Sequence, residues 1–251
     1  AKAYINQEIL ECSIAIEEKK IFKIGKETNM PNADEKKDVH GKLILPGLID
    51  PHVHLRDEGK AYKETFSTGT SSAAAGGVTT VLDMPNNEPV TMSTTTLRNR
   101  MQIAKKKIYV NVGFYSEFPK SIEEIKKIAD LGAIGFKLYF GEKIGGLNID
   151  EDQAIKEAFG KIAELDVPVA VHAEDQKMVE KAVQKLQSNK RYDLSAFLKA
   201  HDESVEYVAI NRLLKIKANI DNMKLHFCHL STQTGLNEIA NTKETDKSVT
   251  C

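Results

Sequence analysis

The sequence predicts an α/β fold whose larger part is a (β/α)8 barrel, incomplete in this chain, preceded by a small β module. From residue 46 onward, short apolar segments typical of buried parallel strands alternate with helical segments six or seven times. Polar residues, histidines above all, stand at the C-terminal ends of these strands, where the sites of such barrels lie. A doubly wound open sheet is the alternative, and the lack of a glycine-rich phosphate loop after the first strand disfavours it.

The composition is that of a globular protein. Of 251 residues, 41% are apolar and 28% are charged, which suits a chain with a sizeable core. The net charge of −1 gives no reason to expect nucleic acid or an anionic membrane as a partner, and no apolar run approaches the ~20 residues of a membrane helix. The three widely spaced cysteines indicate a reducing setting without disulfides, so we expect a cytoplasmic protein.

The first 45 residues predict the small β module. Apolar or alternating segments at 4–5, 9–16 and 21–24 are separated by polar, turn-prone stretches. We therefore expect two domains, 1–45 and 46–251.

The barrel begins with the apolar run 42–49, which we interpret as a buried strand and its approach. Further strands are predicted at 78–84, 108–114, 134–140, 168–172, 225–230 and 249–251. Helices are predicted at 71–75, 121–130 and 152–165, with two more helical stretches between 174 and 218. Because a barrel needs eight strands and this pattern stops at the seventh, we expect the chain to be a fragment.

The first strand leads into a pair of histidines. Alternate residues of a strand point the same way, so His52 and His54 place two imidazoles side by side, a natural start for a metal site. Arg56 follows two residues later, where its planar cationic fork could hold a carboxylate.

Further candidates lie at or within other predicted strands. His172 and His229 end two of them, and four histidines at the same end of successive strands are hard to explain as separate core residues. Lys137 lies between apolar residues of a buried strand, where a charge is costly. It is either a snorkelling or salt-bridged lysine, or one whose lowered pKa lets the neutral amine react with carbon dioxide.

Four stretches resemble one family. The run PGLIDPHVHLRDEG at 46–59 is similar to the first barrel strand of the cyclic amidohydrolases, and the arginine directly after His-x-His-Leu resembles the dihydroorotases in particular. The stretches 84–87, 135–139 and 226–232 support the same resemblance. It implies that residues 1–45 form the N-terminal half of a β-sandwich that flanks the barrel.

The resemblance implies a binuclear zinc site with two ions per subunit. One zinc would bind His52 and His54, the other His172 and His229, and a carbamate on Lys137 would bridge them.

The substrate carboxylate would be bound by Arg56 and Asn86, although Asn86 could also be an ordinary turn residue. The general base of the family, an aspartate, is expected beyond Cys251, so no catalytic residue is assignable. His226 would point away from His229 along its strand, and His40 and His201 would be surface residues.

The implied activity is the reversible hydrolysis of the cyclic amide of dihydroorotate, a small-molecule substrate, to N-carbamoyl-aspartate in pyrimidine biosynthesis. The alternatives are an allantoinase or other cyclic amidohydrolase, a monometal deaminase with no use for Lys137, and an inactive scaffold subunit. A homodimer and an association with an aspartate carbamoyltransferase are both compatible with the resemblance.

Overall fold

The computed structural model describes residues 1–251, which form two compact units, Ala1–Leu48 and Ile49–Cys251. The sequence placed the division after residue 45.

The first unit consists of two small sheets. In the first sheet, β1 (Lys2–Ile5) pairs antiparallel with β2 (Glu8–Glu11) and parallel with β5 (Leu43–Ile44). The second sheet is a separate hairpin of β3 (Ser13–Glu17) and β4 (Lys20–Gly25). The short 3-10 helix η1 (Glu27–Asn29) follows β4. Both hairpins turn through two residues at positive φ, a geometry that matches the twist of the strands. The predicted segment 9–16 is therefore two strands in different sheets, and Leu43–Ile44 pairs with β1 instead of opening the barrel.

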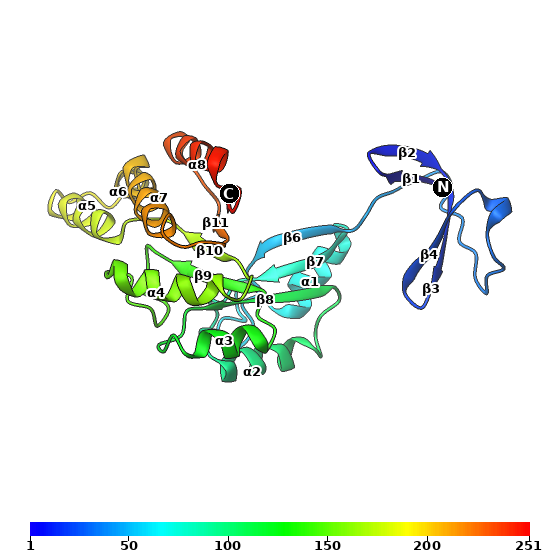
Figure 1. The fold of residues 1–251 in the computed structure, drawn as a ribbon, viewed down its shortest axis with the longest axis horizontal. Helices are drawn as coiled ribbons and strands as arrows, with labels where there is room; N and C mark the ends of the chain where they lie inside the picture. Colours follow the sequence, from blue (N-terminus) through cyan, green and yellow to red (C-terminus); the bar gives the residue numbers. More distant parts are fainter. The chain divides into compact units, whose positions relative to one another are not determined.

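The second unit is built on a parallel sheet of seven strands whose order follows the chain, from β6 at one edge to β12 at the other (Figure 1). The strands are β6 (Leu48–Val53), β7 (Val78–Asp83), β8 (Asn111–Glu117), β9 (Gly135–Tyr139), β10 (Val169–His172), β11 (Leu225–Phe227) and β12 (Val249–Thr250). Consecutive parallel strands joined by helices are the arrangement of an incomplete (β/α)8 barrel.

Eight helices connect the strands. They are α1 (Phe66–Ala75), α2 (Thr94–Ala104), α3 (Glu124–Asp130), α4 (Asp152–Ala163), α5 (Gln176–Ser188), α6 (Leu194–Ala200), α7 (Glu203–Lys217) and α8 (Gln233–Thr245). The sequence did not predict α2 and α8, and found two helical stretches where α5, α6 and α7 lie. Helix α2 begins with three threonines, which are weak helix formers, but Ser93 caps it by accepting a hydrogen bond from the Thr96 amide.

Strand alternation decides which side chains enter the barrel. Phe136 and Leu138 of β9 are buried in the large core cluster that includes residues of the surrounding helices. Lys137 lies between them and therefore points to the opposite face, toward the barrel interior. Its neighbours in register are Glu117 of β8 and Ala170 of β10.

Three strand predictions were displaced. Strand β8 ends at Glu117, three residues after the predicted end, because the run from Tyr115 to Glu117 continues its pairing with β9. Strand β11 ends at Phe227, so His229 follows the strand, at a positive φ of 38°. The predicted buried first strand is β6, whose Ile49 is 64% exposed because β6 is an edge strand with β7 as its one neighbour.

Candidate metal and substrate site

The structure brings the four predicted histidines together. The ring centroid of His52 is 5.3 Å from that of His54 and 5.3 Å from that of His229. The ring of His229 in turn lies 4.9 Å from that of His172. Strands β6, β10 and β11 deliver these side chains at their carboxyl ends, so residues up to 177 positions apart share one cluster.

Burial favours the neutral form of three of these imidazoles, those of His52, His54 and His229. Burial, assisted by the charge of Lys137, lowers the pKa of His52 to about 3. Burial and the nearby Arg56 guanidinium lower the pKa of His54 to about 4, and burial also lowers the pKa of His229. Neutral imidazole is the form that binds metal, so at neutral pH these rings need not lose a proton first.

His172 and His229 meet through their ring nitrogens. The Nδ1 of His172 lies 3.2 Å from the Nε2 of His229. Two nitrogens bound to one tetrahedral zinc at about 2.0–2.1 Å would be about 3.3–3.4 Å apart, so this spacing suits a shared ion.

Glu174 selects the nitrogen that His172 turns toward His229. Its Oε2 accepts a hydrogen bond from the Nε2 of His172 at 3.0 Å, and its Oε1 accepts one from the Nδ1 of His201 at 2.9 Å. The contact with His172, ahead of that with His201, lowers the pKa of Glu174 to about 2. The sequence prediction that His201 is an ordinary surface residue was wrong, because the end of α6 brings it to this carboxylate.

Lys137 is completely buried, and its Nζ has no hydrogen-bond partner. It forms no ion pair, which removes the salt-bridged alternative, and burial lowers its pKa. In its protonated form this amine lowers the pKa values of His52, His54 and His229. The Nζ lies 5.2 Å from the centre of the Tyr139 ring, and burying an amine without a hydrogen bond is unfavourable.

Glu117, the partner of Lys137 in register, was not identified from the sequence because the strand was predicted to end before it. The side chain is buried and its Oε2 has no hydrogen-bond partner. Burial raises the pKa of Glu117 to about 8, so the carboxyl group holds its proton at neutral pH.

The donor set fits a metal centre that one further ligand completes. No three His, Cys, Asp or Glu side chains are placed so that they could hold a metal ion by themselves. His52 lies beside His54, and His172 lies beside His229. The buried amine of Lys137 makes no hydrogen bond that carbamate formation would break. A carbamate on that amine would supply the anionic oxygen ligands that the histidine pairs lack.

The two predicted substrate residues are in direct contact. The Nη1 of Arg56 donates to the Oδ1 of Asn86 at 3.0 Å and to its carbonyl oxygen at 3.1 Å. The same Oδ1 accepts from the Nδ1 of His54 at 2.7 Å, which leaves the lone pair on the Nε2 of His54 free to bind a metal. Asn86 therefore joins a predicted metal ligand to the cation predicted to bind a carboxylate.

A buried ion pair holds the chain on either side of Arg56. Asp83 accepts the Leu55 amide at 2.8 Å and two hydrogen bonds from Arg100, at 2.8 Å from Nε and 2.6 Å from Nη2. The Nη1 of Arg100 also donates to the carbonyl oxygen of Asp57 at 3.1 Å. The sequence did not identify Arg100, because α2 was not predicted.

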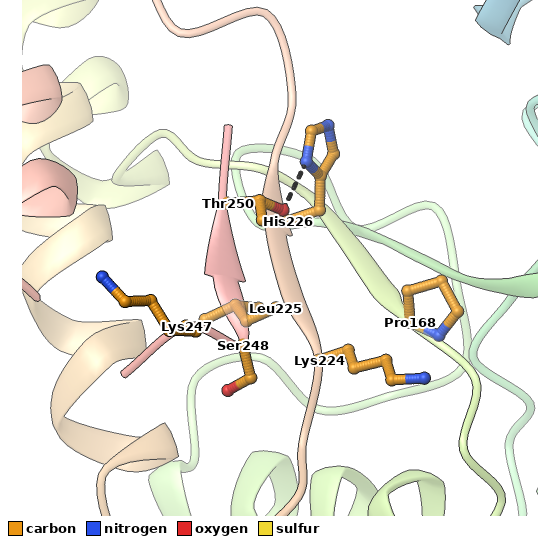
Figure 2. Close-up of a pocket in the computed structure, with 7 residues that line it drawn as sticks. All are labelled: Pro168, Lys224, Leu225, His226, Lys247, Ser248 and Thr250. Atoms are coloured by element: carbon orange, nitrogen blue, oxygen red, sulfur yellow. Dashed lines mark hydrogen bonds between the residues drawn. The ribbon is translucent and has the colours of Figure 1, made fainter. Parts of the chain in front are cut away.

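His226 faces the barrel interior, within electrostatic reach of Lys137 and His52. The expectation that it would point away from His229 was wrong, because β11 ends between the two and strand alternation does not extend to His229. The Nδ1 of His226 contacts the Oγ1 of Thr250 at 3.0 Å (Figure 2).

A pocket of about 480 Å³ lies beside His226, lined mainly by residues that precede strands: Pro168, Lys224, Lys247 and Ser248. It is thus centred at the amino ends of β10, β11 and β12 (Figure 2). The predicted ligands His172 and His229 come after the carboxyl ends, so the pocket is separate from their contact.

The fold is that of hydantoinases of known structure. An L-hydantoinase (dihydropyrimidinase) from Arthrobacter aurescens matches 96% of the chain and 54% of its own length, with a TM-score of 0.88 and 26% identity. A D-hydantoinase from a Thermus species matches with a TM-score of 0.86 and 23% identity, over 99% of this chain and 55% of its own. These matches confirm the predicted fold class, a barrel that is incomplete in this chain.

The family model for dihydro-orotase-like proteins matches residues 41–235, and the chain belongs to that family. A dihydroorotase from Methanosarcina acetivorans is 35% identical over 232 residues, which cover 92% of this chain and 49% of that relative. An allantoinase from Escherichia coli is 29% identical over 247 residues, or 95% of this chain and 53% of the relative. The chain thus spans about half the length of the curated relatives it matches.

No helix combines the length and the apolar character that a membrane crossing needs.

Proposed function

We propose that the protein to which this chain belongs is a dihydroorotase, which hydrolyses the cyclic amide of dihydroorotate reversibly to N-carbamoyl-aspartate. The observation that carries the proposal is the contact chain from Arg56 through Asn86 to His54. It puts Arg56, which can bind a carboxylate, directly beside His54, which can bind a metal. Dihydroorotate carries a carboxylate to be bound and a cyclic amide to be hydrolysed.

The metal part of the proposal concerns two zinc ions per subunit. His52 and His54 would hold one ion, His172 and His229 the other, and a carbamate on Lys137 would bridge them. When bound, the ions would activate water and polarise the ring carbonyl. The lowered pKa values of His52 and His54 support this role, because both rings are unprotonated at neutral pH.

The chain's own residues would position the ring. Arg56 would pair with the substrate carboxylate through two parallel hydrogen bonds, and Asn86 would keep the guanidinium next to His54. A site with a half-buried cation and no carboxylate of its own disfavours an uncharged ring, because the cation would then stay without a counter-charge. This favours dihydroorotate over allantoin and dihydrouracil, although an allantoinase is among the relatives.

The biological setting follows from the same proposal. The enzyme would work in the cytoplasm, in the direction of ring closure during pyrimidine synthesis. The general base, an aspartate by the family resemblance, stays a prediction, as do a homodimer and an association with an aspartate carbamoyltransferase.

The test uses the full-length, zinc-loaded protein with dihydroorotate, allantoin and dihydrouracil in parallel, followed by ultraviolet absorbance. Turnover of dihydroorotate alone is the expected result. Turnover of either other ring would keep the metal site and overturn the substrate. Inactivity toward all three, with zinc shown to be bound, would favour a scaffold subunit.

A further inference from the structure

A second cation converges on the Asn86 carbonyl. The Nζ of Lys60 donates to that oxygen at 3.1 Å, and the Nη1 of Arg56 donates to the same oxygen at 3.1 Å. Both side chains are half-buried. Two positive groups therefore share one uncharged acceptor at the edge of the candidate site.

Neither cation has an acidic partner, whereas other cations of the same region do. Arg100 pairs with Asp83 at 2.6 Å, and Lys107 pairs with Asp57 at 3.0 Å. No carboxylate lies within ion-pair distance of Arg56 or Lys60. Like charges held this close repel one another, and an anion bound between them would relieve the repulsion.

Backbone hydrogen bonds on both sides of Lys60 hold it at this position. The Gly59 amide donates to the Glu88 carbonyl at 2.8 Å, which docks the loop onto the segment that follows Asn86. A Cβ on Gly59 would approach the Cβ of Glu88 to 2.9 Å, so this close contact needs a glycine. The Lys63 amide donates to the Lys60 carbonyl at 2.9 Å and closes the turn.

We propose that Lys60 is a substrate-binding residue, which binds the ligand's carboxylate together with Arg56. The Lys60 ammonium would leave the Asn86 carbonyl and donate to one oxygen of the ligand's carboxylate. The Arg56 guanidinium would donate to the same carboxylate. This inference rests on the proposed function and extends it, because it adds a specificity residue to the pair Arg56 and Asn86. A cyclic amide with a carboxylate is the class of ligand it selects.

The test compares Lys60→Gln with Lys63→Gln in the full-length, zinc-loaded protein. Lys63 belongs to the same loop but is exposed, and its ammonium lies 5.8 Å from the ring centre of the exposed Tyr62. Gln at position 60 removes the charge and keeps an N–H donor for the Asn86 carbonyl, on a side chain one atom shorter. We expect Lys60→Gln to raise the KM for dihydroorotate about 10-fold with kcat within about 2-fold, whereas Lys63→Gln leaves both unchanged.

Calorimetric titration with N-carbamoyl-aspartate gives a second readout, and its Kd should rise by the same factor. Lys60→Arg should restore most of the affinity. If Lys60→Gln behaves like Lys63→Gln in both assays while Arg56→Ala loses turnover, the role of Lys60 is wrong and the proposed function stands. If Arg56→Ala also keeps full activity toward dihydroorotate, the proposed function itself fails.

Discussion

Glu174 and His172 are joined by a contact of 3.0 Å between the carboxylate Oε2 and the ring Nε2. The contact places the ring proton on Nε2 and leaves the lone pair of Nδ1 facing His229. Carboxylates that orient a histidine in this way also make it a better metal ligand.

Glu174→Gln should therefore weaken zinc binding about 10-fold, because the amide lacks the charge that fixes the tautomer. Competition with a chelator measures the zinc affinity directly. Glu180→Gln is the matched control, since Glu180 is exposed on α5 and contacts Gln176. An unchanged affinity in Glu174→Gln would show that this carboxylate has no role at the metal.

Lys137 combines a cost to stability with a proposed use. Its buried amine has no hydrogen-bond partner, so Lys137→Met should raise the free energy of unfolding of the metal-free protein by about 1–3 kcal/mol. The same variant should bind less than two zinc ions per chain, because no carbamate can form. Chemical denaturation and metal analysis of one preparation test both halves. A variant that is destabilised and keeps its full zinc content would contradict this account.

The sequence was sufficient to identify candidate residues that lie in one short stretch or recur along the predicted strands. His52, His54 and Arg56 lie in one short stretch, and Lys137, His172 and His229 were found because each follows or occupies an apolar segment. The structure brings the four histidines together at or after the ends of their strands, whereas Lys137 lies in the middle of β9.

Contacts between distant segments were not predictable in the same way. Glu174 meets His201 across 27 residues, and Lys60 meets Asn86 across 26. Nothing in either local pattern indicates such a partner, since a polar residue in a loop usually faces solvent. Arg100 was missed for a further reason, because the helix that carries it begins with weak helix formers.

The raised pKa of Glu117 should make the free energy of unfolding depend on pH. The pKa of this carboxyl group is raised from 4.5 to about 8 by burial, so between these pH values the folded chain binds more protons than the unfolded chain. Its contribution to stability is complete below pH ~4.5 and is lost as the pH rises to about 8.

Glu117→Gln stays neutral throughout, so it should match the wild type near pH 4.5 and exceed it by about 1–4 kcal/mol at pH 8. Urea denaturation of the metal-free proteins at several pH values gives the difference. Glu157→Gln, on the exposed face of α4, should show no such dependence. A constant difference between Glu117→Gln and wild type would mean that Glu117 is already ionised in the folded chain.

Asp83 and Arg100 form a buried ion pair that contacts the backbone on both sides of Arg56. Arg100 is 1% exposed, and it links Asp83 to the Asp57 carbonyl, one residue beyond Arg56. Arg100→Met leaves the Asp83 carboxylate buried without its counter-charge, so we expect a loss of about 3–5 kcal/mol in the free energy of unfolding.

The double variant Asp83→Asn/Arg100→Met should recover part of this stability, because position 83 then carries no unpaired charge. The recovery is partial because Glu58, whose Oε2 lies 4.0 Å from the Nη1 of Arg100, still loses its counter-charge. The double variant should not recover the placement of Arg56, because the hydrogen bond from Arg100 to the Asp57 carbonyl is still missing. We therefore expect the full-length double variant to keep a raised KM for dihydroorotate while its unfolding free energy moves back toward the wild type. If stability and KM recover together, the ion pair serves folding alone and Arg56 is held by Asn86.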